Sequence, residues 1–129
     1  MTDCKTKIPR LAADFLVAVM APVLTEADAR LVALADDYES LDRRCNEHAA
    51  AHKGLTGAAA AAADTEFDGL VEGYGPIEAE VATTRADSLV GVLAKARLCQ
   101  VPIARGTART DHILSVVDDI HRLFGGRHA

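Results

Sequence analysis

Apolar residues recur at intervals of three and four along most of the chain, which is the spacing of an amphipathic helix. The clearest stretch starts a heptad seam whose members are Leu31, Leu34, Tyr38 and Leu41. Thr25 precedes this seam as an N-cap, Asp28 occupies the third helical position, and Gly54 follows as a C-terminal stop. The pattern predicts one helix over residues 25–53, about 42 Å long at about 1.5 Å per residue.

A second apolar stripe follows a low-complexity stretch. Residues 58–63 are all alanine, and we interpret this stretch as a tolerant connection because alanines specify no packing partner. Beyond it, the sequence predicts a returning helix that packs on the seam and is broken or kinked near Gly75 and Pro76. Its apolar positions are Phe67, Leu70, Val71, Tyr74, Ile77 and Val81.

Two shorter helices are predicted in the last third of the chain. The first ends before Pro102 and contains Gly91, which we attribute to a close backbone crossing because glycine costs roughly 1 kcal/mol relative to alanine inside a helix. Its apolar positions are Leu89, Val92, Leu93, Ala96 and Cys99. The second starts at Thr110 or Asp111 and is expected to face inward through Ile113, Val116, Val117, Ile120 and Phe124.

The sequence therefore predicts an all-α protein: a long antiparallel helical hairpin, coiled-coil-like, with two shorter C-terminal helices. We expect a single helical domain over residues 1–129, divided into an N-terminal helical extension (1–24), the hairpin (25–82) and a two-helix C-terminal part (83–129). The apolar run at residues 15–24 is too short to span a membrane, and Asp14 lies at its edge. We expect a short amphipathic or buried helix there rather than a cleaved signal peptide, and no membrane contact.

Composition narrows the class of function. The chain has 129 residues, of which 50% are hydrophobic and only 4% aromatic. That length excludes a TIM barrel or a full dinucleotide-binding fold, and abundant alanine favours helices lying along one another without a catalytic pocket. We therefore expect a non-enzymatic protein with no catalytic residues and no cofactor.

The net charge of −5 hides an asymmetry between the two parts of the chain. Residues 1–82 carry seven basic and fifteen acidic side chains, whereas residues 83–129 carry seven basic and four acidic ones. The overall acidity argues against a general nucleic-acid binder. The asymmetry favours complementary faces within a fold or an oligomer.

The three cysteines are an odd number and are widely spaced. A secreted disulfide scaffold normally has an even count at closer spacing. Reduced thiols in the cytoplasm fit this pattern better.

Two segments of the C-terminal part resemble a group of small uncharacterised helical proteins of α-proteobacteria, some of them encoded in prophage-like regions. The segments are Thr84-x-Ala86-x-Ser88-Leu89-x-Gly91-Val92-x-Ala94-Lys95-x-Arg97 and Ser115-Val-Val-Asp-Asp-Ile-His-Arg-Leu123. The resemblance implies a cytoplasmic bacterial helical protein of unassigned function, and it provides no catalytic residues.

A metal site is one hypothesis for the end of the long helix. Cys45, His48 and His52 lie three and four residues apart, so one helix face carries a thiol and two imidazoles that can share Zn²⁺ or Cu²⁺, with Cys99 as a fourth ligand. The alternative is that these positions simply continue the heptad seam. Ala49 follows His48 where a His-Glu-x-x-His protease needs glutamate.

A basic patch is a second hypothesis. Its members are Arg85, Lys95, Arg97, Arg105 and Arg109. They could contact phosphates by charge, but no aromatic residue lies among them for base stacking, and contact with the acidic long helix explains the same charges. On the last helix, we expect Asp118 and Asp119 on a solvated face.

The sequence best fits a non-catalytic protein-interaction or structural module that self-associates, with a second copy or another protein as partner. Leu31, Leu34, Tyr38 and Leu41 would carry the contact, either with the returning helix or with a second chain. The alternatives are a metal-binding helical protein and a nucleic-acid-associated prophage factor.

Overall fold

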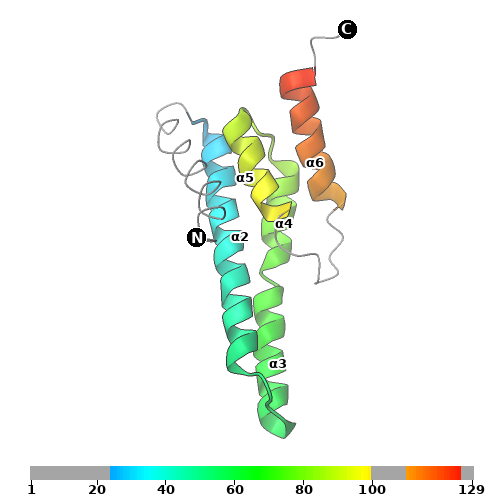
Figure 1. Ribbon diagram of the computed structural model, residues 1–129. Helices are drawn as coiled ribbons and strands as arrows, with labels where there is room; N and C mark the ends of the chain where they lie inside the picture. The colour runs from blue at the N-terminus through cyan, green and yellow to red at the C-terminus, as the bar shows by residue number, and fades with distance from the viewer. Residues whose placement is uncertain (1–23, 100–109, 126–129) are drawn as a thin grey trace, which may run out of the picture.

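The computed structural model describes residues 24–99 and 110–125, and within these ranges the chain is helical and has no strand (Figure 1). The predicted all-α class is confirmed, whereas the predicted N-terminal extension lies almost wholly outside the described residues. The elements are α2 (Glu26–Ala51), α3 (Gly57–Val71), α4 (Tyr74–Thr83), α5 (Leu89–Cys99), α6 (Thr110–Ile120) and a terminal π-helical turn, η2 (His121–Gly125).

The predicted hairpin is formed by α2 and by α3 and α4, which return along it (Figure 1). α2 has 26 residues, and its predicted N-cap is confirmed because Thr25 Oγ1 accepts a hydrogen bond of 3.2 Å from the Asp28 backbone N–H. Beyond α2 the chain turns at Gly54 and Gly57, whose φ angles of +85° and +64° suit glycine. The helix therefore ends two residues before the predicted Lys53.

The alanine run is part of α3 and is not a connection, so that interpretation was wrong. Alanine has the highest helix propensity of all residues, and Ala63 is buried. The break in the returning arm falls at Glu72 and Gly73, close to the predicted position. Pro76 is accommodated in the first turn of α4, where a missing backbone N–H leaves no helical hydrogen bond unmade.

Four helices pack together at one end of the molecule. α5 lies along α2 and runs in the same direction, and α6 packs against both α4 and α5 (Figure 1). α3 and the C-terminal part of α2 extend beyond α5 and α6 as a two-helix stem. The core of the four-helix end contains Leu31, Leu34, Tyr38, Val81, Val92 and Leu98.

Asp28 fixes how α5 sits on α2. Its carboxylate is buried and accepts hydrogen bonds from the Asp87 backbone N–H at 2.8 Å and the Ser88 hydroxyl at 2.6 Å, just before α5 begins. Asp28 thus caps α5 from another helix. Its position three residues after the N-cap Thr25 had predicted a role for Asp28 at the start of α2 itself. Gly91 confirms the predicted close crossing, because a Cβ there would lie 2.1 Å from Asp28 Oδ1.

The inward faces of the two C-terminal helices differ from the prediction. On α5, Leu89, Leu93 and Cys99 are exposed, while Lys95 and Leu98 are buried. α6 is turned almost opposite to the prediction. It buries His112 and Asp119, it packs Val116 partly against the core, and it leaves Ile113, Val117 and Ile120 outside. Phe124, which follows in η2, is exposed as well. Apolar periodicity therefore located both helices. It misplaced the inward face of α6 and was correct for only part of the α5 face, where Val92 is buried.

We expect Gly91→Ala to lower the free energy of unfolding by at least about 2 kcal/mol, because the added methyl group displaces the buried Asp28 carboxylate from its hydrogen bonds. Urea unfolding followed by circular dichroism measures this. Gly69→Ala in α3 is the matched control, since a Cβ there meets nothing within 4 Å, and it should stabilise by up to about 1 kcal/mol. Equal effects of the two substitutions would contradict the close-crossing explanation.

Candidate functional site

The predicted seam on α2 lies in the core of the folded chain. Leu31, Leu34, Tyr38 and Leu41 are all buried and belong to one core cluster with residues of α4 and α5. The Tyr38 ring meets the Tyr74 ring edge-on, with 4.9 Å between the centroids. Of the two partners that the sequence left open, the returning helix is therefore the one observed, and a second chain would need another surface.

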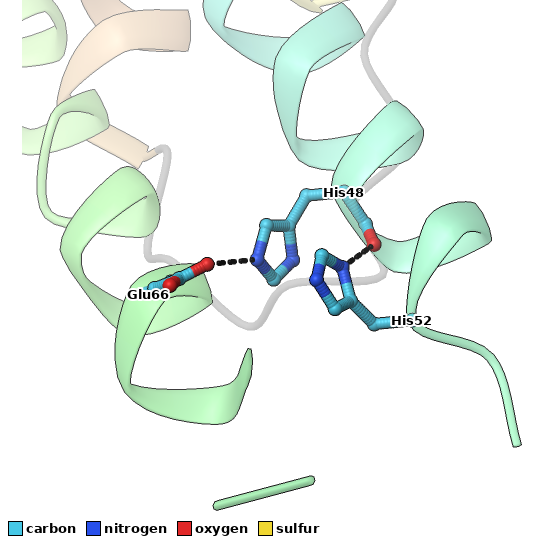
Figure 2. Close-up of side chains that lie close together, drawn as sticks. All are labelled: His48, His52 and Glu66. Carbon is cyan, nitrogen blue, oxygen red and sulfur yellow. Dashed lines mark hydrogen bonds and ion pairs between the residues drawn. The ribbon is translucent and has the colours of Figure 1, made fainter. Parts of the chain in front are cut away.

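At the far end of the stem, three potential metal ligands from both arms of the hairpin converge (Figure 2). His48 and His52 come from the last turn of α2 and its C-cap, and Glu66 comes from α3. One ligand atom from each lies within 4.8 Å of the other two. The two imidazoles stack with 4.0 Å between ring centroids and an angle of 24° between ring planes.

The hydrogen bonds of the two histidines define how their rings are presented. His52 Nδ1 lies 2.8 Å from the His48 carbonyl oxygen. Because a carbonyl oxygen can only accept, Nδ1 carries the proton, and in the neutral ring Nε2 then holds the lone pair. His48 Nε2 lies 3.2 Å from a Glu66 carboxylate oxygen, so a proton or a cation can bridge these two atoms.

A hollow of about 300 Å³ opens beside this group. His48 and His52 line one side, and Ala63, Asp64 and Phe67 line the other. The small side chains of Ala60 and Ala63 on α3 leave this space open.

The other predicted metal ligands are placed elsewhere. Cys45 is completely buried in the core, next to Tyr74, whose hydroxyl donates a 3.0 Å hydrogen bond to Asp42. Burial, together with hydrogen bonds to Cys45 and Asp42, raises the pKa of Tyr74 above its ordinary range. Cys99 is exposed on α5. The structure thus retains His48 and His52 from the predicted set and adds Glu66, which the sequence analysis missed.

Two of the five residues of the predicted basic patch, Lys95 and Arg97, make contacts within the chain. Arg97 donates hydrogen bonds to Glu39 at 2.9 Å and to Asp36 at 2.6 Å, both on α2, and these bonds raise the pKa of Arg97. The charge contact with the acidic long helix is therefore observed for Arg97. Lys95 is buried, Arg85 is exposed, and Arg105 and Arg109 lie outside the described residues.

Lys95 forms a buried ion pair with Asp119, which corrects the expectation that Asp119 is solvated. Lys95 Nζ lies 2.5 Å from Asp119 Oδ2 and 2.7 Å from the Ser115 hydroxyl. Asp119 Oδ1 also accepts a hydrogen bond of 3.0 Å from Arg122. A lysine and an aspartate on separate helices can leave water together because each is neutralised by the other. Asp118, the neighbouring acid, is exposed as predicted.

The same group holds the turn between α4 and α5. The Ala86 backbone N–H donates to Asp119 Oδ2 at 3.1 Å, and Arg122 donates to the Ala86 carbonyl oxygen. Burial raises the pKa of Asp119, but the hydrogen bonds from Lys95, Arg122 and Ala86 outweigh it, so that the pKa lies below its ordinary value.

A signal for this buried group was present in the sequence. His112, Ser115, Asp119 and Arg122 recur at intervals of three and four, so that they form a polar stripe along one helix face. His112 is buried as well, with Nε2 at 2.9 Å from the Lys95 carbonyl oxygen. A polar stripe on a helix is ordinarily expected to face solvent. This stripe is buried because Lys95, a cation on the facing helix, pairs with Asp119.

Comparison with known proteins found no matching family model, no matching curated protein and no matching solved structure. The resemblance to α-proteobacterial helical proteins stays a prediction. None of the described helices has the length and apolar character that crossing a membrane requires.

We expect Asp119→Asn to lower the free energy of unfolding by about 3–5 kcal/mol at neutral pH, because it leaves the buried Lys95 ammonium without a counter-ion. Asp118→Asn, one position away and exposed, is the matched control and should change it by less than about 0.5 kcal/mol. Chemical unfolding of both variants provides the comparison. Similar losses would show that the ion pair does not stabilise the fold.

The same pair predicts a pH dependence. Because the pKa of Asp119 is lowered in the folded chain, its stabilising contribution is complete above about pH 4, the ordinary value for aspartate, and is lost as the pH falls toward the lower folded pKa. Unfolding free energies measured between about pH 7 and 3 should fall more steeply in the parent chain than in Asp119→Asn. Parallel curves would contradict this assignment.

Proposed function

We propose that this protein is a non-catalytic interaction module that self-associates through the outer face of α6. The observation that carries the proposal is the orientation of that helix. α6 is amphipathic, yet it turns its polar stripe into the protein and its apolar stripe outward. Apolar surface on the outside of a helix is stabilised when a partner covers it.

The outer stripe is regular and large. It continues from α6 into η2, and its members are Ile113, Leu114, Val117, Ile120 and Phe124, each 40–56% exposed. Half-exposed side chains of this size leave about 90 Å² each in water, so that the stripe covers roughly 450 Å², within the range of about 300–600 Å² reached by the largest patch of a typical monomer. The largest apolar patch of a monomer is often functional.

A second copy of the chain is the partner that the spacing favours. Ile113, Val117 and Ile120 follow the four-three intervals of a coiled-coil seam along α6, with Phe124 exposed beyond them in η2. Such a stripe can pack against its own symmetry mate. An antiparallel pair would bring the Asp111 end of one helix to the His121 end of the other. Two such faces would bury about 900 Å², which is below the roughly 1,200 Å² of a stable interface and corresponds to a weak dimer that forms at high protein concentration.

The buried ion pair supports this role because it fixes α6 before any partner binds. Lys95 and Asp119 join α5 to α6, so the outer stripe is presented on a rigid helix. Cys45 is a free thiol in the core, and this supports the cytoplasm as the compartment of the protein.

The test is the mass in solution. We expect light scattering to give twice the 13.6 kDa chain mass for the parent protein and the single-chain mass for Ile113→Gln/Val117→Gln, with unchanged helical circular dichroism. Leu55→Gln is the matched control, because Leu55 is similarly exposed but lies in the turn of the hairpin, and it should remain dimeric. A folded parent chain that stays monomeric at high concentration would refute the proposal.

A further inference from the structure

We propose that His48, His52 and Glu66 bind a divalent transition-metal ion, with Zn²⁺ as the expected occupant, and that the ion joins the two arms of the hairpin stem. The proposal concerns a different part of the molecule from the α6 face and does not rest on self-association. It begins from the convergence of two imidazoles and one carboxylate on a single point between α2 and α3 (Figure 2).

The donor set is one that zinc uses. Two histidines and one glutamate form a three-ligand set that occurs in zinc proteins, where water occupies the fourth position. Ligands at about 2.0–2.1 Å from a tetrahedral ion lie about 3.3 Å apart. The distance of 3.2 Å from His48 Nε2 to the Glu66 oxygen already matches that separation.

The second imidazole is oriented by a backbone contact. His52 Nδ1 donates to the His48 carbonyl oxygen, which leaves Nε2 as the nitrogen with a lone pair, and Figure 2 shows that nitrogen on the side toward Glu66. Metal-binding histidines usually donate their other ring N–H to a carbonyl or a carboxylate in this way. On binding, Zn²⁺ takes the place of the proton between His48 Nε2 and Glu66, and the neutral His48 ring carries its proton on Nδ1.

The surroundings favour a cation and leave room for its water ligand. The hollow of about 300 Å³ beside the histidines includes Asp64, a further oxygen donor on α3. α3 and α4 contain several acidic residues and neither lysine nor arginine. An excess of negative charge along this arm raises the local concentration of cations.

An ion at this position would have a structural consequence. The stem is the part of the hairpin that α5 and α6 do not cover (Figure 1). Among the residues that the structure describes, its two helices are held together by their mutual contacts and the turn. A bond from Zn²⁺ to each arm holds α3 against α2 at the end farthest from the four-helix core.

The experiment is a calorimetric titration of tag-free, metal-stripped full-length protein with ZnCl₂. We expect one equivalent per chain and a raised melting temperature. Glu66→Gln and His48→Gln should each weaken binding by at least about tenfold, because even outer-shell partners change metal affinity by about 10–100-fold. His121→Gln removes an exposed histidine outside the site, and it should bind as the parent does.

Co²⁺ in place of Zn²⁺ separates this site from one that uses cysteine. Nitrogen and oxygen ligands give no sulfur-to-cobalt charge-transfer absorption, so we expect that band to be absent at one equivalent. A strong band that persists in Glu66→Gln would assign the metal to the thiols and overturn the proposal. The proposal would also be overturned if the protein did not bind Zn²⁺. It would be overturned too if Glu66→Gln and His48→Gln bound Zn²⁺ as the parent does while their circular dichroism showed them to be folded.

Discussion

Two buried aspartates, one from the first described helix and one from the last, hold the turn between α4 and α5. Asp28 accepts from Asp87 and Ser88, and Asp119 accepts from Ala86 in the same turn. These contacts set the rotation of α5 on α2 and of α6 on α5, because each carboxylate must reach a fixed backbone group. The four-helix end is therefore oriented by polar contacts and filled by apolar ones.

Sequence patterns predicted the helices well and the faces of two of them poorly. The N-cap at Thr25 and the reversal near Gly54 are local properties, and both were predictable. The close crossing at Gly91 is a contact between helices, and it was predictable because a glycine inside a helix needs such a reason. Which face of α6 turns inward depends on an ammonium group 24 positions before Asp119, supplied by Lys95. Amphipathic periodicity reports that a helix has two faces, and it cannot say which is buried when a buried ion pair compensates the polar one.

The candidate metal site shows the same limit. His48 and His52 share a face because their spacing is helical, so their proximity followed from sequence. Cys45 had equally suitable spacing, but it belongs to the core beside Tyr74. Glu66 could not be recognised, because its approach depends on where the hairpin turns and on the register of α3 along α2. The alanine run that was taken for a connection is the part of α3 that precedes Glu66.

The buried ion pair also bears on the order in which the protein can be completed during synthesis. α2 to α5 leave the ribosome before α6, and during that interval Lys95 has no carboxylate from Asp119 to neutralise it. A nascent chain can form the hairpin from contacts between neighbouring helices. Lys95 stays in water until Asp119 has been synthesised, and only then can α5 pack with Lys95 buried. Closure of the core is thereby coupled to arrival of the last helix, and a chain truncated before Asp119 would lack the charge that allows Lys95 to be buried.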